Sequence, residues 1–242
     1  MILSKSNIIR SNSIALNTGA ISSGALANVQ NPDFSKVVSS TSTTFKFTFA
    51  SVGSSKYVAL HGISFPIGAV VTVTGSGFSE TYTMVRDIKN LVFYVATAVT
   101  LNSLAIEVAG AGTKTISYVS AGLTTEVTWG VTAGQTLRYL SHNKRSRVAT
   151  NSRGMPTKAI QEETNNKLNV NYTNAPKTWA RADFLEVLAH YDTDSIVSMI
   201  DYEADDNPEE SYCMFDLTGG EVNAHAEAPL LVNVTMSFRV IA

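Results

Sequence analysis

The chain has 242 residues, a mass of 26.0 kDa, a formal net charge of −2 and only 16% charged residues. A net charge this small excludes a general electrostatic attraction to nucleic acid or to an anionic membrane. The single cysteine excludes a disulfide within the chain, and no stretch of about 18 apolar residues predicts a membrane span. No apolar run follows the first residues, so we expect no signal peptide and synthesis in a cytoplasm.

The first 24 residues are rich in serine and asparagine, and their few large apolar residues recur at irregular spacing. A segment without a helical or strand period has no continuous face from which to build its own core. Residues 1–24 are therefore predicted to form an extended N-terminal arm. The arm would become ordered on the following domain or on another chain.

Residues 25–140 show one strand pattern after another. In the first, Phe45, Phe47 and Phe49 alternate with polar residues, which places the three rings on one face. Further strands are predicted at 56–61, 69–74, 80–85, 91–96, 102–109, 114–120, 124–129 and 135–140. Short strands separated by glycine and asparagine turns are typical of an antiparallel sandwich. The chain is therefore predicted to be mainly β, with a jelly-roll-like sandwich over 25–140.

Residues 141–242 are predicted to be a C-terminal elaboration of this sandwich. A strand is expected at 167–172, and one short helix near 178–190. The apolar stripe of that helix would consist of Phe184, Leu185, Val187, Leu188 and Tyr191. The chain then ends in a long alternating pattern, Leu230–Val240, which predicts a final strand that rejoins a sheet.

Two charged segments flank this helix, and both are predicted to be loops. The basic residues of 141–166 include Lys144, Arg145 and Arg147, and the acidic stretch includes Asp201, Glu203, Asp205 and Asp206. Complementary segments on a nearly neutral chain can meet within the fold or between copies, where they fix the register of an interface. Our hypothesis is that these seven residues meet across a subunit boundary in a homo-oligomer.

The sequence predicts no catalytic, cofactor-binding or metal site. The four histidines lie in separate segments without metal-ligand spacing: His61, His142, His190 and His225. His61 ends a strand, and a packed histidine is favoured over a catalytic or ligand-binding one. A calcium site is the alternative for the acidic stretch, although no segment matches a twelve-residue calcium loop. A sugar platform is the alternative to core packing for the aromatic residues.

Several segments together carry a resemblance to known proteins: Ala27–Pro32, Phe45–Phe49, Tyr57–Gly62 and Gly68–Val73. The chain resembles tail-tip or baseplate-associated structural proteins of long-tailed bacteriophages. Residues 44–129 are similar to the galactose-binding-like jelly-roll of carbohydrate-binding modules and of such tail proteins.

The resemblance implies a non-enzymatic subunit of a phage virion tail tip or baseplate, with other virion tail proteins as its partners. The alternative reading is a carbohydrate-binding module used for host-surface adhesion, with a host glycan as partner. A hydrolase whose site is not visible in the sequence is a third reading, because catalytic triads assemble from distant residues.

Overall fold

The computed structural model describes residues 2–126, 144–150, 156–163, 167–200, 211–215, 220–224 and 230–241. The fold is mainly β, and all strand pairs among the described residues are antiparallel. The predicted fold class, an antiparallel sandwich with one helix, is confirmed.

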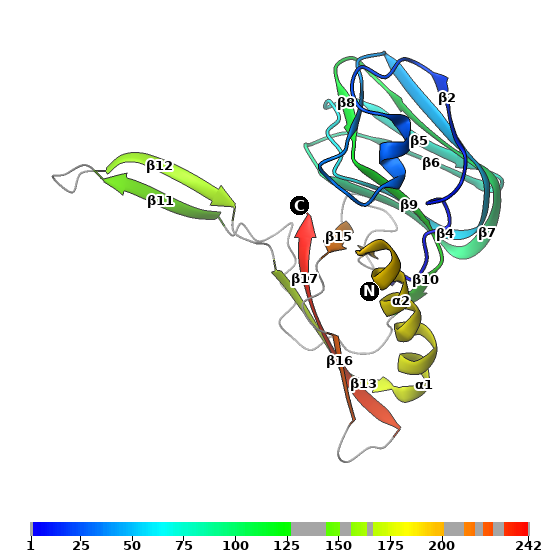
Figure 1. Ribbon diagram of the computed structural model, residues 1–242, viewed down its shortest axis with the longest axis vertical. Coiled ribbons are helices and arrows are strands. Elements are labelled where there is room, and N and C mark those ends of the chain that lie inside the picture. Colours follow the sequence, from blue (N-terminus) through cyan, green and yellow to red (C-terminus); the bar gives the residue numbers. More distant parts are fainter. Residues whose placement is uncertain are drawn as a thin grey trace.

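The sandwich is built on one large sheet in which β9 joins β4 and the other strands follow the order β2-β4-β7-β5-β6. Its strands are β2 (Ile14–Thr18), β4 (Thr44–His61), β5 (Val70–Gly75), β6 (Phe78–Thr83), β7 (Asn90–Ala109) and β9 (Tyr118–Gly122). The smaller pair β3 (Val38–Ser40) and β8 (Lys114–Ile116) and the 3-10 turn η1 (Leu26–Gln30) complete this part of the molecule (Figure 1).

Strands β4 and β7 are each one long strand where the sequence predicted two. They pair along almost their whole length, with register shifts between Ala50 and Gly53 and between Ser55 and Tyr57. Such bulges bend a strand and increase its twist, so both strands curve around one core. Phe45, Phe47 and Phe49 are fully buried in that core, as the alternation predicted.

A second sheet contains most of the described C-terminal part, and the N-terminus as well. Its order is β10-β1-β14-β15-β17-β13, and β16 also pairs with β17. Its strands are β1 (Ile2–Ser4), β10 (Thr124–Glu126), β13 (Lys167–Pro176), β14 (Ile196–Ile200), β15 (Ser211–Phe215), β16 (Gly220–Ala224) and β17 (Leu231–Ile241). The final strand therefore rejoins a sheet, and its residues Val232 and Val234 are buried.

The N-terminal residues contribute to both sheets. Strand β1 lies between β10 and β14, and β2 pairs with the first half of β4. Ile2 and Leu3 are buried, and Ile2 packs against Tyr57, Ala59 and Val92 on the outer face of the sandwich. This segment thus joins the sandwich to the second sheet.

One continuous helix runs through α1 (Lys177–Trp179), the π-helical segment η3 (Ala180–Phe184) and α2 (Leu185–Asp194). Its buried face comprises Trp179, Ala180, Phe184, Val187, His190 and Asp194. Leu185, which was predicted on the apolar stripe, is 53% exposed. With 3.6 residues per turn, Leu185 lies on the side of α2 opposite Val187 and Asp194, so it cannot share their buried face. No helix in the described ranges is long and apolar enough to cross a membrane.

The predicted basic loop contains a β-hairpin made of β11 (Lys144–Thr150) and β12 (Pro156–Glu163). In the register of this hairpin Lys144 lies opposite Glu163, and Arg145 lies opposite Glu162. Among the described strands, β11 and β12 pair only with each other, and the hairpin projects away from both sheets (Figure 1).

The acidic half of the proposed interface, Asp201, Glu203, Asp205 and Asp206, lies outside the described residues. The hypothesis that it meets Lys144, Arg145 and Arg147 across a subunit boundary therefore stays a prediction.

Candidate functional site

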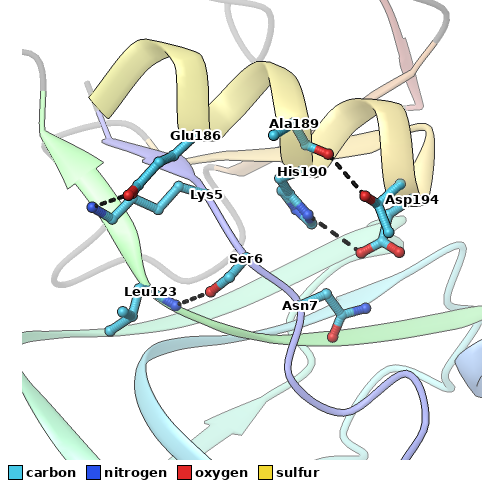
Figure 2. A pocket seen from close by; sticks show the side chains of 9 residues that line it. Lys5, Ser6, Asn7, Leu123, Glu186, Ala189, His190 and Asp194 are labelled. Carbon is cyan, nitrogen blue, oxygen red and sulfur yellow. Dashed lines mark hydrogen bonds and ion pairs between the residues drawn. The ribbon is translucent and has the colours of Figure 1, made fainter. Parts of the chain in front are cut away.

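An open pocket of about 450 Å³ lies where the sandwich, the N-terminal segment and helix α2 meet. Figure 2 shows how its walls face one another, with α2 on one side and the segment after β1 on the other. We call it the junction pocket, and its lining residues are Lys5, Ser6, Asn7, Leu123, Glu186, Ala189, His190, Thr193 and Asp194.

Hydrogen bonds to the sandwich fix the wall formed by Ser6 and Asn7. The Leu123 backbone N–H donates to Ser6 Oγ at 2.8 Å, and Asn7 Nδ2 donates to the Tyr118 hydroxyl at 2.7 Å. A Cβ at Gly122 would lie 2.3 Å from the Ser6 carbonyl oxygen, so only glycine permits this close approach. The polar groups of this wall are therefore held in place before any ligand arrives.

Lys5 reaches across the pocket to the helix. Its Nζ lies 2.8 Å from Glu186 Oε2 and 3.2 Å from Asp183 Oδ1. Burial alone would lower the pKa of Lys5, but the hydrogen bonds and charges of the two carboxylates outweigh it and raise the pKa. The ammonium is thus charged and locally neutralised.

A buried histidine–aspartate pair forms the deeper part of the pocket. His190 Nδ1 lies 3.3 Å from Asp194 Oδ2, and their side chains are 4% and 2% exposed. Arg10 Nη1 donates to the other carboxylate oxygen and to the Thr193 carbonyl. Burial alone would raise the pKa of Asp194, but the interactions with His190 and Arg10 hold it below its ordinary value.

Asp194 is therefore an ionised acceptor that keeps a proton on His190 Nδ1. His190 Nε2 has no hydrogen-bond partner among the described residues. The ring points from α2 toward the segment of Ser6 and Asn7 (Figure 2). This nitrogen is available to a ligand.

A second polar cluster lies between the two sheets. His61 Nδ1 lies 3.0 Å from Asn90 Oδ1, and His61 Nε2 lies 2.8 Å from Ser198 Oγ. Because an amide oxygen only accepts, Nδ1 carries the proton and Nε2 accepts from the serine hydroxyl. Burial outweighs the hydrogen bond to Asn90 and lowers the pKa of His61 to about 4.

The order hydroxyl, imidazole, amide is one used in nucleophilic catalysis. Ser198, His61 and Asn90 are nevertheless only 1%, 0% and 4% exposed, so a substrate has no access to the hydroxyl. Ser198 N also donates to Ser4 Oγ, which extends the cluster into β1. The cluster therefore links the sandwich to the second sheet, and the prediction of a packed histidine at position 61 is confirmed.

Sequence reasoning missed most of the junction pocket. His190 was considered only as a possible metal ligand, and Asp194 only as part of the acidic stretch with its alternative of a calcium site. Lys5 and Glu186 were not singled out. His142 and His225 lie outside the described residues. Among the described residues, no group of three or more potential metal ligands occurs. One local signal is present in the sequence: His190 and Asp194 are four residues apart, which places them on the same face of a helix.

No protein-family model matches the sequence, and no curated protein matches it. Solved structures that resemble about half of the chain include a fucose-binding module of Streptococcus pneumoniae, SpX-3, with 11% identity and a TM-score of 0.38. The alignment covers 49% of this chain and 98% of that module.

The lectin domain of lectinolysin, complexed with Lewis B antigen, has 13% identity and a TM-score of 0.39 over 48% of this chain and 94% of that domain. Chitosan-binding module 1 from a Paenibacillus sp. IK-5 chitosanase/glucanase has 12% identity and a TM-score of 0.38. The alignment covers 48% of this chain and 97% of that module. These neighbours are carbohydrate-binding modules, but a likeness at this level does not say what this chain binds.

Proposed function

We propose that the protein is a non-catalytic attachment protein that binds a glycan in the junction pocket. The observation that carries this proposal is the lining of the pocket. An imidazole nitrogen, an ammonium, a carboxylate and hydroxyl groups converge on a volume of about 450 Å³, which is the size of a small-ligand site. Sugar hydroxyls both donate and accept hydrogen bonds, so they suit such a mixed lining.

The same geometry supports a binding role over a catalytic one. Ser198 is sealed between the sheets, and in the junction pocket no described hydroxyl donates to His190. A nucleophile and its base must lie within hydrogen-bond reach, although such contacts can be longer before substrate binds. The described residues therefore provide sites for binding and no activated nucleophile.

Binding of the full chain to an array of immobilised glycans tests this proposal. We expect saturable binding to at least one glycan class and at least a tenfold loss for His190→Asn, which retains a donor near Nδ1 and lacks Nε2. His190→Gln, whose amide reaches the position of Nε2, is expected to retain part of the affinity. The absence of binding to any glycan, with the protein folded, would contradict the proposal.

A second candidate function is the structural one, a subunit of a phage virion tail tip or baseplate that assembles in the virion with other tail proteins. The projecting β11–β12 hairpin favours it. An isolated two-stranded hairpin is only marginally stable in water, and it gains stability from further strands or a packed face. Another protein chain, including a second copy, could provide that surface.

Replacing residues 144–163 with a short glycine–serine linker tests the structural candidate. We expect the full chain to form an oligomer and the shortened chain to be a monomer, as measured by light scattering. Because the hairpin pairs with no other described strand, the urea unfolding midpoint should change little. A full-length protein that stays monomeric at high concentration and captures no tail protein would count against assembly.

A further inference from the structure

We propose that the junction pocket selects neutral sugars with adjacent free hydroxyl groups and rejects sugars that carry carboxylate or sulfate groups. This inference rests on the glycan binding proposed above and specifies its chemistry. It follows from three features of the pocket: a salt-bridged donor and acceptor at its rim, an imidazole nitrogen deeper inside, and cations that are already paired.

The rim presents a donor and an acceptor side by side. Lys5 Nζ has three N–H donors, of which Glu186 and Asp183 take two, so one is left for a ligand. Glu186 is 57% exposed in its side chain and has a second carboxylate oxygen to offer. Two neighbouring hydroxyls fit this arrangement, because one can accept from Lys5 while the other donates to Glu186.

The deeper end of the pocket presents a fixed polar atom. Asp194 holds the His190 ring through Nδ1, so Nε2 is the ring nitrogen left for a ligand. The imidazole is held by Asp194, which is itself held by Arg10, so the ring loses little freedom when it binds. A third hydroxyl of the same sugar, which can both donate and accept, can hydrogen-bond to this nitrogen.

The charge balance disfavours anionic ligands. The described cations at this site, Lys5 and Arg10, are both held by carboxylates. A ligand carboxylate or sulfate would therefore enter beside Glu186 and Asp194 without gaining a free cation. In a partly buried site, like charges at close range repel without full screening by solvent.

Matched pairs of neutral and anionic sugars test the inference with the full chain. The probes are lactose against 3′-sialyllactose and N-acetylglucosamine against its 6-sulfate, added in solution to compete with the glycan that binds best on the array. We expect each neutral sugar that binds to have at least tenfold higher affinity than its charged counterpart. The affinity of monodeoxy derivatives of the bound sugar should be at least fivefold lower when the missing hydroxyl is one of the adjacent pair.

Glu186→Gln and Lys5→Met test the residues. Both side chains lie at the rim, so folding should be retained, and affinity for the neutral sugar should fall about tenfold. Glu107→Gln is the matched control, because Glu107 forms a comparable pair with Lys46 at 3.1 Å on the sandwich sheet, away from the lining residues. This variant should bind like the unmodified protein.

The outcomes separate the two proposals. Preferential binding of the sialylated or sulfated sugars, or equal binding within each pair, would overturn the selectivity while leaving glycan binding intact. Unchanged affinity in both rim variants would also overturn it. If no sugar binds on the array or in solution, the proposed function itself is wrong, and the selectivity falls with it.

Discussion

Replacing Lys114 with methionine is expected to lower the free energy of unfolding by about 3 kcal/mol, at about 1 kcal/mol for each of three hydrogen bonds lost. The Lys114 side chain is fully buried, and its Nζ donates to the carbonyl oxygens of Ser42, Gly110 and Gly112 at 2.7, 2.5 and 3.1 Å. Burial lowers the pKa of this ammonium, and each of its three N–H donors is matched by one carbonyl oxygen.

Methionine retains most of the side-chain volume, so the loss should come from the three carbonyls left without a donor rather than from a cavity. Lys46→Met is the matched control: Lys46 lies at the surface in an ion pair with Glu107, and its loss should cost about 0–1 kcal/mol. Urea unfolding of both variants measures the difference. Equal losses of unfolding free energy in the two variants would show that the three hydrogen bonds of Lys114 contribute no more than a surface ion pair.

The stability of the protein is expected to fall by about 3 kcal/mol between pH 6.5 and pH 4 because of His61 alone. Burial lowers the pKa of this imidazole from 6.5 to about 4 in the folded chain. Between these pH values the unfolded chain binds a proton that the folded chain does not. The contribution is therefore complete above pH 6.5 and is lost as the pH falls toward 4.

Urea unfolding at pH 7.5, 6.5, 5.5 and 4.5 checks this expectation, with His61→Gln as the comparison. The glutamine amide can hydrogen bond but does not titrate, so the stability of the variant should depend less steeply on pH. The difference in slope should approach 1.4 kcal/mol per pH unit in the middle of the range. Parallel pH profiles for the two proteins would mean that His61 is not kept neutral by burial.

Much of the fold could be predicted because the signals are local. The alternation of Phe45, Phe47 and Phe49 indicates one buried face, and the final strand shows the same period. The continuous apolar run before His61 has a different cause, since both faces of β4 are covered there. Val58 and Leu60 face the sandwich core, whereas Tyr57 and Ala59 pack against Ile2.

Three details of the structure go beyond the predicted elements. The N-terminal residues have no period of their own because β1 and β2 complete two different sheets, where pairing partners fix their conformation. Leu185 was placed on the apolar stripe because it lies beside Phe184 in the sequence, but an ordinary helical period already puts it on the side of α2 opposite the buried residues Val187 and Asp194. The strands predicted at 44–50 and 56–61 form one strand, β4, because the chain continues to pair with β7 on both sides of the bulges near Gly53.

The junction pocket could not be predicted from local patterns. Lys5 and Glu186 are brought together only when β1 enters the second sheet and α2 packs beside it. His190 and Asp194 have the helical spacing i, i+4, which the sequence shows. The sequence does not show that Arg10, near the N-terminus, pairs with Asp194 as well. Polar groups of this kind become informative only when burial and partners are known.

Mapping of amide chemical-shift changes on titration with the best-binding neutral sugar tests whether the glycan binds in the junction pocket. We expect the largest changes to cluster at residues 5–7, at Leu123 and along α2 from Glu186 to Asp194, and to disappear in His190→Asn. Changes confined to the opposite faces of the sandwich or to the β11–β12 hairpin, with this cluster unaffected, would contradict this expectation.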